Sequence, residues 1–172
     1  MQTGPLTFDT HEMGRRPGTE KSFTREVPAP ADLGLDVLTV PKGSPIALEV
    51  RLECVMEGVL VTGSASATVE GECVRCLNEI EFPLDVRFQE LYVYGEPDED
   101  ELALEDDILD LDPVLRDAVV LELPQNPLCS QDCPGLCIEC GARLADDPDH
   151  THGPAIDPRW SALTELTERP EE

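Results

Sequence analysis

A short segment near the end of this chain carries four cysteines and, shortly afterwards, two histidines. The six residues are Cys129, Cys133, Cys137, Cys140, His150 and His152. Zn²⁺ takes four thiolate or imidazole ligands in a tetrahedron, and a Cys-x-x-Cys turn followed by glycine lets two sulfurs reach one ion. Because the segment has no other obvious means of folding, its composition predicts a zinc site.

A second Cys-x-x-Cys motif, Cys73 to Cys76, lies between two predicted strands, where the chain must turn as a hairpin. A hairpin tip can present two sulfurs to one ion, but two ligands do not hold a structural metal. Either the C-terminal cluster supplies a second pair and completes a split site, or these two thiols work without a metal. The sequence leaves both readings open.

The start of the chain has no basic segment followed by an apolar one, and no later run approaches the roughly 18 apolar residues of a membrane span. We therefore expect a cytoplasmic protein. Thiols stay reduced in the cytosol, which makes disulfide pairing among the seven cysteines the weaker reading. A thioredoxin-like role would place its Cys-x-x-Cys at a helix start in a βαβ unit, and neither motif has that setting.

The balance of charge bears on the partners. The chain has 37 acidic against 12 basic side chains, a net charge of -25. Such a field repels phosphate backbones over about a Debye length, so non-specific nucleic-acid binding is disfavoured. An RNA contact would need a local basic patch, and Arg15-Arg16-Pro17-Gly18 is the best local candidate, with a solvated turn as the alternative. Without such a patch, the chain would contact a basic protein that is itself bound to the RNA.

Periodicity predicts an α+β fold with an antiparallel β-sheet or partly closed barrel as its core. Apolar residues alternate with charged ones in 46–54 and again in 80–88, the pattern of strands with one buried face. Residues 58–63 and 65–73 are expected to form two further strands, and Cys54 to be a small buried residue. Asp112 is expected as the N-cap of a helix that ends before Pro124.

The organisation follows from these elements. We expect one domain in four parts: an extended arm with short strands at 1–45, an antiparallel β core at 46–94, an acidic linker at 95–110, and a final part at 111–172. The final part holds the helix, the Cys/His zinc segment and a short C-terminal helix that opens at Asp157.

Taken together, several motifs resemble the bacterial YceD family, the large ribosomal RNA subunit accumulation proteins, also described as domain of unknown function 177. The likeness covers nearly the whole chain. It is carried by Gly-Glu-Cys73-Val-Arg-Cys76-Leu, the Asp112-Pro-Val-Leu-Arg-Asp-Ala118 segment, the cysteine cluster ending at Gly141, Ile156-Asp-Pro-Arg159, and an actinobacterial Gly14-Arg-Arg-Pro-Gly18.

The resemblance implies a non-catalytic role in the accumulation or processing of large-subunit ribosomal RNA. The resemblance also implies a Cys-x-Cys in many relatives where this chain has His150-Thr-His152, and residues two apart in an extended chain point the same way. The swap favours metal ligation by the histidines, with a solvated loop as the alternative. Some members of the family lack the cysteine cluster, which implies that zinc has a structural role and not a chemical one. For ligands we favour Cys137 and Cys140, then Cys129 and Cys133, with His150, His152, Cys73 and Cys76 as alternates.

Two mechanisms fit this role. A patch formed by Arg15, Arg16, Arg75, Arg143 and Arg159 could bind precursor RNA, or the acidic surface could dock a basic large-subunit ribosomal protein or pre-ribosomal particle. The charge favours the second, and neither involves a membrane or a small-molecule substrate. We expect no enzyme, because the chain lacks the open zinc site and general base of a metal hydrolase. The alternative function is a zinc/thiol redox-responsive regulatory protein.

Overall fold

The computed structural model describes residues 4–99 and 101–152 of a chain that divides into two compact units, Met1–Cys133 and Pro134–Glu172. The helices and strands of the described residues all belong to the first unit. The helix expected from Asp157 onward and the candidate contact residue Arg159 lie outside the described residues.

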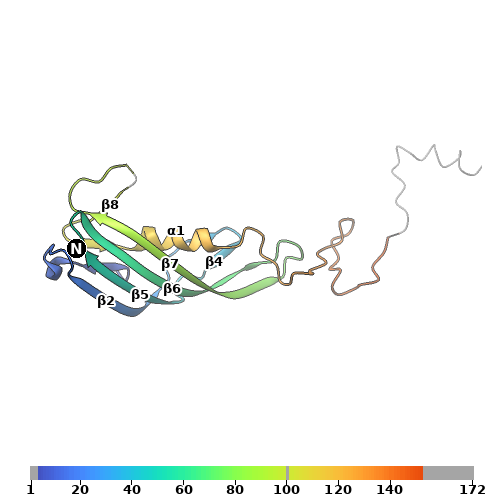
Figure 1. Ribbon diagram of the computed structural model, residues 1–172. Helices are drawn as coiled ribbons and strands as arrows, with labels where there is room; N and C mark the ends of the chain where they lie inside the picture. Colours follow the sequence, from blue (N-terminus) through green and yellow to red (C-terminus); the bar gives the residue numbers. More distant parts are fainter. Residues whose placement is uncertain (1–3, 100, 153–172) are drawn as a thin grey trace, which may run out of the picture. The chain divides into compact units, whose positions relative to one another are not determined.

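An open, mostly antiparallel sheet forms the body of the first unit (Figure 1). The neighbouring strands β2 (Glu20–Pro28), β5 (Pro45–Cys54), β6 (Gly58–Glu72) and β7 (Glu79–Val93) run antiparallel. Past the end of its pairing with β5, β6 pairs with β4 (Leu38–Val40), which in turn pairs with β3 (Leu33–Leu35). The two-residue β8 (Leu102–Ala103) lies parallel to β7. The predicted α+β class with an antiparallel sheet is confirmed.

Alternation of side chains builds the core as the sequence predicts. In β5 the even-numbered residues from Ile46 to Cys54 are buried, and Cys54 is only 1% exposed. In β7 the inward residues Leu84, Val86 and Phe88 are buried as well. Successive side chains of a strand face opposite sides of the sheet, so this pattern gives the sheet one apolar face.

The strand β6 differs from the expectation of two strands divided near Gly63. It runs without interruption from Gly58 to Glu72. Gly63 does not mark a turn, and its lack of a side chain allows neighbouring atoms to pack closely against it. A Cβ at this position would lie 2.6 Å from the ring of Phe88 and 2.7 Å from the carbonyl oxygen of Glu49. Glycine in a strand often marks such a close approach.

The strand β2 was not predicted. Most of its residues are polar, and Phe23 and Val27 are its only large apolar side chains. It lies at an edge of the sheet and pairs with β5 along its whole length. An edge strand buries little surface, so its sequence carries a weak alternation signal.

The helix α1 (Asp112–Glu122) lies along the sheet (Figure 1). It packs against β7 and β3 and buries Val114, Leu115 and Val119. Its predicted extent is confirmed, but Asp112 is the first helical residue and Leu111 is the N-cap. Asp112 instead binds the guanidinium of Arg116, which reaches on to the carbonyl oxygens of two residues that precede β3. These bonds hold the helix against the sheet.

The N-terminal arm is tied to the segment before this helix. β1 (Thr7–Asp9) pairs with β9 (Ile108–Asp110), and a short 3-10 turn, His11–Met13, follows β1. The region 95–110, expected as an acidic linker, thus contains two short strands, β8 and β9. Among the helices of the described residues, none has the length and apolar character needed to span a membrane.

Candidate metal centre

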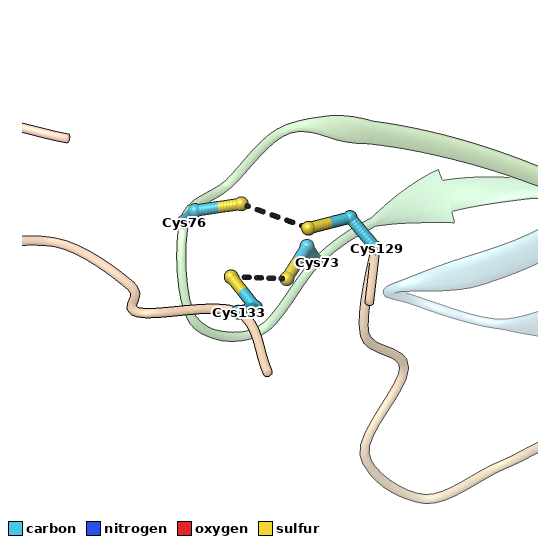
Figure 2. A group of neighbouring side chains, drawn as sticks. All are labelled: Cys73, Cys76, Cys129 and Cys133. Carbon is cyan, nitrogen blue, oxygen red and sulfur yellow. Dashed lines mark hydrogen bonds between the residues drawn. The ribbon is translucent and has the colours of Figure 1, made fainter. Parts of the chain in front are cut away.

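The first Cys-x-x-Cys motif occupies the turn between β6 and β7, at the predicted hairpin tip. The backbone N–H of Cys73 donates to the carbonyl oxygen of Asn78 at 2.8 Å, and the N–H of Leu77 donates to that of Cys73 at 2.9 Å. Leu77 takes a left-handed φ of 57°, which tightens the turn. This turn brings the sulfurs of Cys73 and Cys76 together (Figure 2).

The loop that follows α1 supplies a second pair of thiols to the same place. The sulfur of Cys133 lies 3.8 Å from that of Cys73, and the sulfur of Cys129 lies 3.6 Å from that of Cys76 (Figure 2). All four sulfurs lie within 4.8 Å of one another. Two hydrogen bonds attach the loop to the hairpin: Val74 N–H to the carbonyl oxygen of Pro127, and Arg75 Nη1 to that of Cys133, both 3.0 Å long.

These distances suit a tetrahedral ion and not a disulfide. Sulfurs that each lie about 2.3 Å from one ion define a tetrahedron with edges of about 3.8 Å. A disulfide would need about 2.05 Å between sulfurs. The described residues include all seven cysteines, and none forms a disulfide. We name Cys73, Cys76, Cys129 and Cys133 the four-cysteine group.

Burial and backbone dipoles set the chemistry of the four-cysteine group. Cys73, Cys76 and Cys133 are at most 3% exposed. Burial acts to raise the pKa of Cys73, but hydrogen bonds from the backbone at Cys129, Arg75 and Cys76 outweigh it and lower the pKa to about 6. The turn therefore favours a thiolate at this position, which is the form that binds metal.

Cys76 shows the opposite balance. The backbone at Asn78 acts to lower the pKa of its thiol, yet burial and the neighbouring thiols of Cys73 and Cys129 together raise that pKa. Several thiolates in one place repel one another unless a cation compensates their charge. A divalent ion held by the four-cysteine group would compensate this charge.

A second group of ligand atoms lies in the unit Pro134–Glu172. The sulfur of Cys137 lies 3.1 Å from Nε2 of His152, and the sulfur of Cys140 lies 3.2 Å from Nε2 of His150. The two Nε2 atoms are 2.9 Å apart. We name these four residues the cysteine–histidine group.

The structure divides the four cysteines that the sequence favoured as one ligand set. Cys129 and Cys133 join Cys73 and Cys76, whereas Cys137 and Cys140 join the two histidines. The split site left open for Cys73 and Cys76 is the arrangement found for their sulfurs. The expectation of one set relied on closeness in sequence, while the hairpin turn reaches the loop after α1 only in the folded sheet.

Two of the arginines proposed as a contact patch, Arg15 and Arg75, lie far apart in the first unit. Arg15 pairs with the Asp107 carboxylate at 2.8 Å and lies over the Tyr94 ring, just beyond the end of β7. Arg75 lies at the other end of that 15-residue strand, about 45 Å away at the usual rise per residue. Arg16 and Arg143 are exposed.

Comparison with known proteins adds the identity of the family. Residues 61–167 match the model described as "Large ribosomal RNA subunit accumulation protein YceD". The chain belongs to the YceD family. The predicted resemblance is therefore confirmed over more than half of the chain.

Several relatives are similar over most of their length. The uncharacterized protein Rv2926c of Mycobacterium tuberculosis is 42% identical, over 94% of this chain and 81% of its own. The uncharacterized protein ML1660 of Mycobacterium leprae is 40% identical, over 94% and 77%. The uncharacterized protein YlbN of Bacillus subtilis is 24% identical, over 96% of each chain. No solved structure matches this chain.

Proposed function

We propose that this protein is a non-catalytic ribosome biogenesis factor that supports the accumulation or processing of large-subunit ribosomal RNA. The observation that carries the proposal is its membership of the YceD family, whose description names this role. We further propose that it acts by docking a basic ribosomal protein or a pre-ribosomal particle, because its net charge of -25 attracts cationic partners and repels bare RNA.

The donor set of the four-cysteine group supports Zn²⁺ as its ion and a structural role for that ion. Four thiolates fill a tetrahedral zinc completely, whereas a catalytic zinc keeps one position open for water or substrate. Three of the four cysteines are buried, so solvent has little access to the site. An ion here would hold the β6–β7 hairpin to the loop after α1.

One surface is especially suited to a cationic partner. A groove of about 740 Å³ lies beside the β6–β7 hairpin. Its acidic lining consists of Asp36, Glu70, Glu72, Glu79 and Glu81. Val37, which is 49% exposed, adds an apolar contact to the same groove.

The acids of this groove stand opposite one another. Glu70 pairs with Glu81 across the two strands, and Glu72 pairs with Glu79. Like charges directly opposite on a sheet destabilise it. None of the four forms an ion pair with another described residue. A lysine-rich segment bound in the groove would remove this repulsion. The arrangement therefore favours a docking role for the groove.

Capture from growing cells tests the proposal. The tagged protein is purified at low salt, with and without ribonuclease, and its large-subunit precursor RNA and basic ribosomal proteins are quantified. We expect both to be enriched, and the proteins to persist after ribonuclease. If neither the precursor RNA nor the ribosomal proteins are enriched, the docking proposal is wrong.

Two charge-matched variants and a third variant locate the dock. The groove variant changes Glu70, Glu72, Glu79 and Glu81 to Gln, and the control variant makes the same change at the scattered, exposed Glu26, Glu57, Glu90 and Glu122. A third variant changes Glu99, Asp100 and Glu101 to Ser. We expect only the groove variant to lose capture. Equal loss in the groove and control variants would show that net charge alone attracts the partner, and loss only in the third would place the dock in the acidic segment.

Direct RNA binding has its own test. If precursor RNA is recovered through the arginines, replacing Arg15 and Arg16 with Ser abolishes its recovery while the ribosomal proteins stay bound. We expect no such loss, because Arg15 is already paired with Asp107.

A thiol-based regulatory function is the second candidate, favoured by the exposure of Cys129 and Cys140. In that case peroxide oxidises two ligand thiols to a disulfide and is itself reduced to two waters, and the metal and the partner are released together. Partner capture that peroxide leaves unchanged would exclude this function.

A further inference from the structure

The described part of the second unit, residues 134–152, has almost nothing buried in it. No large apolar side chain in this range is buried, and Ile138 is fully exposed. Apart from one isolated bridge between Leu136 and Arg143, these residues form no strand and no helix. A hydrophobic core therefore does not account for how this segment holds its shape.

The same segment nevertheless contains a specific set of backbone hydrogen bonds. Cys137 N–H donates to the carbonyl oxygen of Ala142 at 2.7 Å, and Gly141 N–H donates to that of Cys137 at 2.8 Å. Leu144 N–H donates to the carbonyl oxygen of Gly135 at 3.1 Å. Ordering a residue costs about 1–2 kcal/mol of backbone entropy, so something other than apolar burial must stabilise this arrangement.

The turn repeats the one in the four-cysteine group, residue for residue. In both, the first cysteine donates to the carbonyl oxygen five residues on and accepts from the N–H four residues on. That fourth residue has a left-handed φ in both turns, 57° at Leu77 and 75° at Gly141. In both, the backbone two and three residues after the first cysteine also faces its sulfur. The second motif thus has the same metal-presenting conformation as the first.

The histidines are oriented as metal ligands usually are. Each turns Nε2 toward the two sulfurs and Nδ1 toward a carboxylate: Nδ1 of His150 lies 3.4 Å from Asp147, and Nδ1 of His152 lies 3.3 Å from Glu139. A metal-bound histidine almost always gives its other ring N–H to such an oxygen, which fixes the tautomer. The carboxylates therefore leave both Nε2 lone pairs for an ion.

From these observations we infer that the second unit binds a Zn²⁺ of its own through Cys137, Cys140, His150 and His152, and that this ion takes the place of a hydrophobic core. Two thiolates and two imidazoles make a tetrahedral set that selects zinc. The chain then carries two zinc ions, one in each unit. The inference does not depend on the proposed ribosomal role.

Counting ions in the full chain tests the inference. Metal-free protein is reconstituted with Zn²⁺, and native mass spectrometry gives the number bound. We expect two ions in the wild type, one in a His150→Ala and His152→Ala double variant, and two in the control His11→Ala, which removes an exposed imidazole outside both groups. A Cys73→Ser and Cys76→Ser variant should keep one ion, which shows that the second site does not need the first.

Cobalt distinguishes the two ligand sets without relying on a variant that folds poorly. Co²⁺ in the wild type should give the absorption of one four-sulfur and one two-sulfur, two-nitrogen site, and the histidine variant should keep the first spectrum alone. Changing Glu139 to Gln and Asp147 to Asn should weaken binding at the second site about 10–100-fold and leave the first unchanged.

Hydrogen exchange tests the role of the ion as a core. Zinc should protect the amides of Cys137, Gly141 and Leu144, and this protection should vanish in the histidine variant while the amides of β6 stay protected. A single ion in the wild type, two ions in the histidine variant, or protection of these amides that is independent of metal would each overturn the inference.

Discussion

The sulfur of Cys73 lies 3.8 Å from the sulfur of Cys133, sixty residues further along the chain. The intervening residues contain β7 and α1. The contact therefore closes a long segment of chain that includes both elements. Closing a long loop costs entropy that local turns do not recover, and a shared ion can supply the missing stabilisation.

Removing one ligand of the four-cysteine group should abolish the stabilisation that zinc gives to the β body. We choose Cys129→Ser because Cys129 is the exposed member, so the change removes a ligand with little loss of packing. When free zinc is a thousandfold above its dissociation constant, binding contributes about 4 kcal/mol to the free energy of unfolding. The measurement is thermal unfolding, followed by the circular dichroism of the sheet, with and without zinc.

The control for this experiment is Cys54→Ala, which removes a buried thiol outside both groups. It should lower stability slightly but keep the full zinc-dependent increase. An equal increase in Cys129→Ser and in the wild type would show that zinc does not act through this group.

Replacing Leu77 with glycine should stabilise the protein. Leu77 has a φ of 57° and is 56% exposed, so it bears a left-handed backbone and buries little. The conformation costs an L-residue about 1–2 kcal/mol, and the freer unfolded chain of glycine offsets part of that gain. We expect an increase of about 1 kcal/mol in the free energy of unfolding, measured by urea denaturation of the zinc-loaded protein. Leu77→Ala, which keeps a Cβ, should give no such increase.

Gly63→Ala should destabilise the sheet by about 1–3 kcal/mol, the usual cost of overpacking. Its new Cβ would press on the ring of Phe88 and on the carbonyl oxygen of Glu49. Adding Phe88→Leu should recover part of the loss, because it relieves the ring contact but not the backbone one. A double-mutant cycle by denaturant unfolding measures this coupling, and additive effects would contradict the clash. Gly4→Ala, whose Cβ has only an ordinary contact, is the control.

Stability should depend on the ionisation of Asp107. The guanidinium of Arg15 bonds to this carboxylate, His11 adds a second contact, and together they hold its pKa below the ordinary value. A carboxyl whose pKa is lowered by folding stabilises the protein above its unfolded pKa, and this contribution is lost as pH falls through the folded pKa.

Asp107→Asn should therefore cost about 1 kcal/mol at neutral pH, the scale of a well-formed surface ion pair, and almost nothing in strong acid. Asparagine tolerates the left-handed φ of 61° at this position, so backbone strain does not confuse the result. Asp106→Asn, at an exposed neighbour that also has a positive φ, is the matched control. A loss that does not vary with pH would argue against the ion pair as its cause.

Features decided within a few residues could be predicted. The alternation in Ile46–Cys54 specifies a half-buried strand, and the run from Val114 to Val119 between two prolines specifies α1. Both Cys-x-x-Cys motifs form tight turns because the hydrogen bonds of each turn span only four or five residues. The family resemblance also depends on such local motifs, and the matching family model bears it out.

Other features depended on the tertiary structure, because they join segments that are far apart in sequence. The polar strand β2 forms by pairing with β5. Gly63 lies within strand β6, where the Phe88 ring packs so closely over it that there is no room for a side chain. The pairing of Arg15 with Asp107 likewise joins residues 92 positions apart.

The choice of ligand partners shows the division most clearly. The sequence by itself determined that each Cys-x-x-Cys motif lies in a tight turn, since turn geometry is local. Only the folded sheet decided that Cys73 and Cys76 meet Cys129 and Cys133, over separations of 60 and 53 residues. Strand register and the packing of α1 set those distances, and neither can be read from the spacing of cysteines along the chain.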